Sequence, residues 1–101
     1  MPVSLFMFLA HGVAKQTSGY RPGARHALML FATGETIDLA RSQADKRATQ
    51  RGWEHIEVKR EKSLGGDATG IKDETLKPAA ETALSDGASI VVYGQELPLD
   101  S

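Results

Sequence analysis

The sequence predicts an α/β protein with a small sheet and a parallel βαβαβ core. Residues 26–32 and 88–93 are apolar at alternating positions on both faces, which is typical of strands that are covered on two sides. Residues 53–60 instead alternate apolar and polar side chains and indicate a half-exposed strand at an edge. Helical patterns separate the three segments, as connections between parallel strands require.

The same patterns predict a strand order. The two fully apolar strands should be neighbours, with the alternating strand outside the first, so we expect the order 2-1-3 for the parallel core. Right-handed crossovers would then place the two helices on opposite faces. The alternative is a two-layer α+β sandwich whose second apolar face is buried in a dimer.

The N-terminal segment 3–10 is apolar but far shorter than the roughly twenty residues that a membrane span requires. It also lacks the basic region that begins a signal peptide. We expect an additional edge strand here, followed by a glycine- and proline-containing loop over residues 12–25. In a single domain of 101 residues, segment 1–25 could be peripheral to a compact core at 26–93, with a polar tail at 94–101.

The first helix is expected from about residue 34 to residue 51, because small apolar residues recur there at three- and four-residue steps. Thr33 is placed to cap its first turn. Gly52 is placed to end it in the left-handed conformation, and Trp53 would then pack back against Ala48. The repeating apolar residues are Ile37, Ala40, Ala44 and Ala48.

The second helix is expected to begin near residues 73–77 and to end at Asp86 and Gly87. Pro78 lacks an amide hydrogen and must therefore lie in the first turn or kink the helix. The preceding loop, residues 63–72, contains three glycines. It lacks both the Gly-Lys-Ser/Thr ending of a P-loop and the spacing of a dinucleotide fingerprint.

Composition excludes several classes of function. Twelve Lys and Arg against thirteen Asp and Glu give a net charge of −1, which provides no general attraction to nucleic acid or to an anionic membrane. The absence of cysteine excludes disulfides and thiolate chemistry. A hydrophobic fraction of 41% with 25% charged residues is typical of a globular protein, which we expect to be soluble and cytoplasmic.

A candidate ligand site follows from the parallel core. Ligands of open α/β sheets bind at the carboxyl ends of strands, where the winding reverses. Backbone amides at the start of the first helix could bind an anion there. Capping alone also explains these residues, and Glu35 would oppose an anion. The predicted ligand-binding residues are Thr33, Gly34, Thr36, Gly94 and Gln95.

No motif identifies a reaction. There is no Gly-x-Ser-x-Gly elbow, and the three histidines lack a metal-binding spacing. We therefore expect a small interaction or regulatory module without a catalytic site, cofactor or metal, whose partner is unknown and could be a second copy in a homodimer. The alternative is a small-molecule or anion-binding protein, which could be an enzyme, using the crevice near Thr33 and Gly94.

Overall fold

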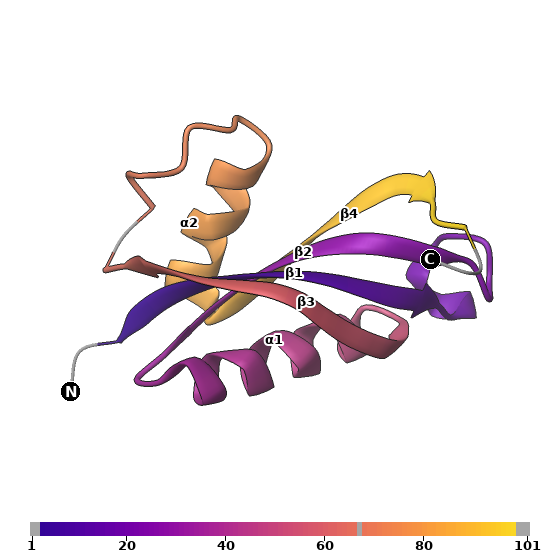
Figure 1. Ribbon diagram of the computed structural model, residues 1–101, viewed down its shortest axis with the longest axis horizontal. Coiled ribbons are helices and arrows are strands. Elements are labelled where there is room, and N and C mark those ends of the chain that lie inside the picture. Colours follow the sequence, from indigo (N-terminus) through magenta and orange to yellow (C-terminus); the bar gives the residue numbers. More distant parts are fainter. Residues whose placement is uncertain (1–2, 67, 99–101) are drawn as a thin grey trace.

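The computed structural model describes residues 3–66 and 68–98, which form a four-stranded sheet with a helix on each face (Figure 1). No helix in this part of the chain is long and apolar enough to cross a membrane. The elements in chain order are β1 (Ser4–Ala14), the short 3-10 helix η1 (Gln16–Ser18), β2 (Arg25–Gly34), α1 (Ile37–Gln50), β3 (Trp53–Gly65), α2 (Leu76–Asp86) and β4 (Ala88–Glu96).

The sheet is antiparallel throughout, with the strand order β3-β1-β2-β4. The predicted parallel βαβαβ core with strand order 2-1-3 is therefore wrong. The alternative α+β class is closer, because helices pack on an antiparallel sheet. In this fold, however, α2 of the same chain covers part of the second face, where the alternative required a dimer partner.

The N-terminal strand causes the main difference. β1 was expected at an edge, but it lies in the interior, between β2 and β3. It forms a hairpin with β2 in which Ser4 pairs with Gly34 and Val13 with Arg25. β2 and β3 both run antiparallel to β1, so they are parallel to each other, as their helical connection allows, but β1 separates them.

β4 differs from the prediction in direction and position. β3 ends near Leu5, at the same end of the sheet as the end of β2, and the chain returns through α2 to begin β4 beside Ala32. β4 therefore runs antiparallel to β2 and forms an edge of the sheet. It also extends to Glu96, so part of the expected tail belongs to a strand.

One face of the sheet is covered by α1 (Figure 1). The predicted stripe of small residues is confirmed, because Ala40, Ala44 and Ala48 are all buried. Gly52 has the predicted positive φ, at 92°, and Trp53 is buried in the same cluster as Ala48. The sheet contributes these residues to the cluster: Phe6, Phe8, Ala10, Ala14, Leu28, Leu30, Ala32 and Ala88.

The other face packs on α2 and the loop before it (Figure 1). Ala80 and Ala83 of α2 pack with Leu5 and Phe31, which lie toward one end of the sheet. Eleven residues give a helix of only about 16 Å, whereas β1, also with eleven residues, extends over about 36 Å. Farther along this face the apolar residues of β1 are only half-buried.

Candidate functional site

The predicted site residues do not form one crevice. Thr33 and Gly34 lie at the end of β2, and Thr36 caps α1. Gly94 and Gln95 lie near the end of β4, close to the pairing of His26 with Glu96 at the opposite end of the sheet. The prediction placed them together because it assumed parallel strands, whose carboxyl ends meet at one edge.

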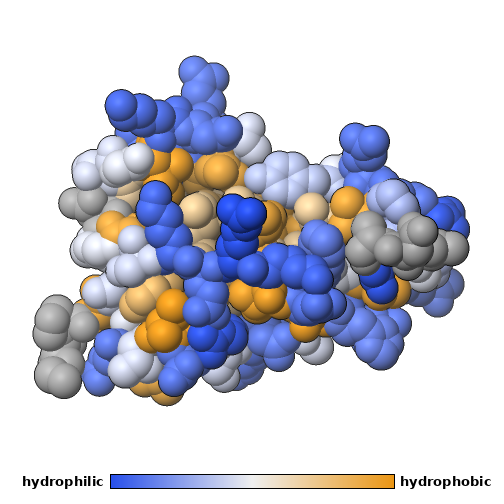
Figure 2. All heavy atoms as spheres, in the orientation of Figure 1, coloured by the Kyte–Doolittle hydropathy of each residue, from blue (hydrophilic) through white to orange (hydrophobic). Residues whose placement is uncertain are grey.

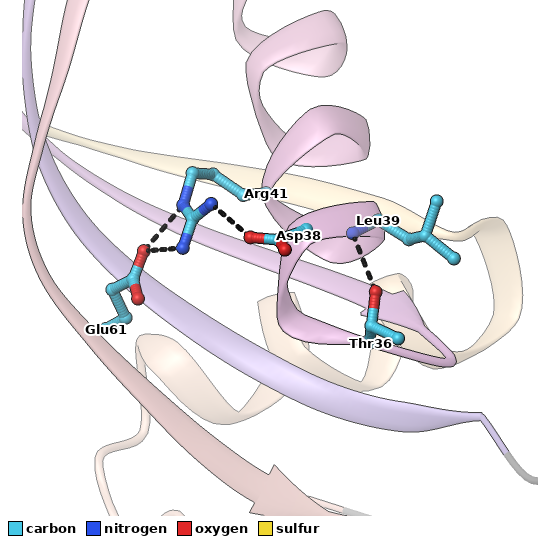
Figure 3. A network of polar contacts seen from close by, with 5 residues as sticks. All are labelled: Thr36, Asp38, Leu39, Arg41 and Glu61. Atoms are coloured by element: carbon cyan, nitrogen blue, oxygen red, sulfur yellow. Dashed lines mark hydrogen bonds and ion pairs between the residues drawn. The ribbon is translucent and has the colours of Figure 1, made fainter.

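The predicted residues near α1 have structural roles. The backbone N–H and the hydroxyl of Thr33 both donate to the carbonyl oxygen of Gly87, at 3.0 and 3.3 Å. The Thr36 hydroxyl accepts a hydrogen bond from the backbone N–H of Leu39 (Figure 3). A Cβ atom on Gly34 would lie 2.8 Å from the backbone nitrogen of Ala40, so glycine lets α1 pack closely on the end of β2.

A groove of about 630 Å³ remains beside these residues. Its wall is about equally polar and apolar, and it contains side chains of opposite charge, Glu35 and Lys46. Leu39, 54% exposed, is one of its apolar residues. Only two of the five predicted residues line this groove, which is formed by Val3, Thr33, Gly34, Glu35, Leu39, Ser42, Gln43 and Lys46.

A different hollow, which we call the sheet pocket, lies on the face that α2 partly covers. It has a volume of about 330 Å³ and is lined by Met7, Leu9, Met29, Arg60, Glu61 and Lys62. Met7, Leu9 and Met29 form an apolar floor on β1 and β2. Apolar surface gathers between α2 and the sheet in this region, beside strongly hydrophilic side chains (Figure 2).

Strand register explains how charged residues come to border this floor. Arg60 pairs with Leu9 and Lys62 with Met7, so both basic side chains lie on the same face as the floor. Glu61 pairs with Phe8, which belongs to the core beneath α1. Its side chain therefore lies on the α1 face, and the pocket border is basic.

The Glu61 carboxylate is held on that other face by Arg41 of α1 (Figure 3). The Arg41 Nε donates to Oε1 at 2.6 Å, and Arg41 also donates to Asp38 at 2.8 Å. Hydrogen bonds to Asp38 and Glu61 raise the pKa of Arg41. These contacts of Arg41 keep the carboxylates of Asp38 and Glu61 away from the sheet pocket.

His26 is a buried polar residue near the start of β2, with 1% of its surface exposed. Its Nδ1 atom lies 2.8 Å from the carbonyl oxygen of Tyr93, so Nδ1 carries the hydrogen that is donated there. Nε2 has no hydrogen-bond partner among the described residues. The rings of Tyr20 and Trp53 pack against the imidazole, at centroid distances of 4.9 and 5.5 Å, and make it part of the core.

The residues of the sheet pocket were not predicted from the sequence. The first signal was available in segment 3–10, which is apolar at both odd and even positions and therefore fits an interior strand better than an edge. The second was the run Lys59, Arg60, Glu61 and Lys62, which continues the alternating strand beyond the expected end. Within the described part of the chain, no three potential ligand side chains form a metal-binding group.

No family model, curated protein or solved structure matches the chain, so comparison with known proteins assigns it to no family.

Proposed function

We propose that this protein binds a small molecule with an apolar part in the sheet pocket. The observation that carries the proposal is the apolar floor of Met7, Leu9 and Met29, which the short helix α2 leaves accessible at the border formed by β3. The volume of about 330 Å³ lies near the lower end of the range for small-molecule sites, about 300–1,000 Å³.

The chemistry of the floor supports an apolar ligand. Met7 and Leu9 are half-buried, and Met29 is 9% exposed. A ligand that covers these side chains gains about 25 cal/mol for each Å² of apolar surface removed from water. Methionine is flexible and polarisable, so two methionines allow the floor to adjust to the shape of a ligand.

The groove beside Thr33 is larger, but it supports the proposal less well. Its hydroxyl donor at Thr33 already bonds Gly87, and the cap at Thr36 already bonds Leu39. Glu35 and Lys46 provide no excess of either charge. The small-molecule function that the sequence left as an alternative is therefore proposed for a different place.

Binding of the neutral fluorophore N-phenyl-1-naphthylamine tests this proposal. We expect its fluorescence to rise with the wild-type protein, and Leu9→Lys to reduce this rise by placing an ammonium at the floor. Leu39→Lys is the matched control, because it makes the same change in the groove beside Thr33. If the probe does not bind the folded wild-type protein, or if Leu39→Lys has the larger effect, the proposal fails.

An interaction module is a second candidate, because β4 is an open edge of the sheet. The exposed strand edge presents backbone hydrogen-bonding groups that could pair with another strand, including that of a second copy. Ile90, Val91 and Val92 on this strand are only half-buried. Light scattering at two protein concentrations should then show the mass of a dimer. A monomeric mass at both concentrations would rule out a homodimer.

A further inference from the structure

We infer that the sheet pocket selects an anion, namely a small apolar monocarboxylate whose acid group is bound by Arg60 and Lys62. This inference rests on the proposed function, because it assigns the ligand class of the same pocket. It goes further by giving the two basic residues a role in specificity. The floor would hold the hydrocarbon part of the ligand, and the border on β3 would hold its charge.

The pairing of charges supports this inference. Several basic residues have acidic partners, since Arg21 binds Glu96 and Lys59 binds Glu57. Arg60 and Lys62 have no acidic partner among the described residues, although both are exposed and lie within reach of the pocket. A carboxylate at the pocket would give them a counterion that none of the described residues provides.

Their spacing suits one acid group. Arg60 and Lys62 are two residues apart on a strand, which separates their Cα atoms by about 7 Å on one face. The planar guanidinium of arginine can donate two parallel hydrogen bonds to a carboxylate, and lysine adds a mobile point charge. Their aliphatic stems can also cover the hydrocarbon part of the ligand.

Nearby acids do not cancel this charge. The Glu61 carboxylate lies on the opposite face and is bound by Arg41. Glu57 is the neighbouring acid of β3 on the pocket face, where it pairs with His11, but its carboxylate accepts a hydrogen bond from Lys59 at 2.7 Å. That hydrogen bond lowers the pKa of Glu57. The pocket therefore combines an apolar floor with two positive charges that no acidic side chain among the described residues pairs with.

Titration of the full chain with octanoate and 1-octanol tests the charge selection. The two ligands have the same number of carbon atoms, and their polar groups differ in charge. We expect octanoate to bind the wild-type protein about tenfold more tightly, which corresponds to about 1.4 kcal/mol. In the double variant Arg60→Gln/Lys62→Gln this preference should disappear, because octanoate affinity should fall about tenfold more than octanol affinity.

The control is Lys46→Gln/Arg47→Gln, which removes the same two charges from α1 and includes the lysine of the groove beside Thr33. It should retain the preference for octanoate. If the wild-type protein binds both ligands equally, the inference is overturned while the proposed function stands. If it binds neither, the proposed function fails as well. If the control loses the preference to the same extent, the anion is held elsewhere and the inference is overturned.

Discussion

Arg41 of α1 binds Glu61 of β3 through a hydrogen bond of 2.6 Å from Nε to Oε1. This contact joins the helix to an edge strand and fixes the carboxylate on the face opposite the sheet pocket (Figure 3). Arg60 and Lys62, the neighbours of Glu61 along β3, therefore border the pocket. The acid between them in the sequence lies on the opposite face. The alternation of a single strand thus separates a stabilising ion pair from a candidate binding site.

Replacing Glu61→Gln tests this separation. We expect a slightly lower melting temperature, because the charge of the contact with Arg41 is lost at a partly exposed position. Octanoate affinity should change by less than about twofold, since the carboxylate does not face the ligand. Calorimetry would measure both effects, and a large gain in octanoate affinity would show that Glu61 acts on the pocket.

Replacing Gly52→Ala should destabilise the fold by about 1–3 kcal/mol. Gly52 has a φ of 92°, and a Cβ atom there would lie 2.5 Å from the backbone nitrogen of Ser18. Gly94→Ala is the control, because its Cβ atom would meet nothing within 4 Å. Denaturant unfolding should separate the two variants, and equal stabilities would contradict the close approach of η1 to the end of α1.

Replacing His26→Ala should cost about 2–4 kcal/mol of unfolding free energy, because it leaves a cavity and removes the hydrogen bond to Tyr93. His55→Asn is the control. His55 is exposed and has a φ of 50°, a conformation that asparagine tolerates, so its replacement should change stability by less than about 0.5 kcal/mol. A small effect at His26 would indicate that this imidazole is not packed in the core.

The contact between Arg21 and Glu96 should make stability depend on pH. The hydrogen bond from Arg21 lowers the pKa of Glu96 below its ordinary value of 4.5. The pair therefore stabilises the fold above the unfolded-state pKa, and this contribution is lost as the pH falls through the lowered folded-state value. Glu96→Gln should be less stable than wild type at pH 7, and the difference should vanish in strong acid. Thermal unfolding across this range would contradict the prediction if the difference stayed constant.

The sequence predicted the elements better than their arrangement. The apolar pattern located β2, β4 and both helices, because burial on one or two faces determines the spacing of apolar residues along the sequence. Strand direction depends on which end of the sheet each connection reaches. That is decided by the hairpin of β1 and β2 and by the path into α2, and neither has a distinctive local pattern.

The site was predicted less well for the same reason. Thr33 and Gly94 would share a crevice only if β2 and β4 were parallel, and the antiparallel pairing places them at opposite ends. The sheet pocket joins Met7, Met29 and Arg60 from three strands. Their proximity depends on the register of β1 with both neighbours, which no single segment contains.

The most direct test of the account is an NMR titration of the full-length protein, labelled with ¹³C at the methionine methyl groups, with octanoate. Met7→Leu and Met29→Leu would assign the two resonances. We expect both resonances to shift together along one saturating curve, because Met7 and Met29 form the floor of a single pocket. If octanoate binds while both resonances stay in place, the sheet pocket is not its binding site. If octanoate does not bind, the selection of a carboxylate by Arg60 and Lys62 is wrong.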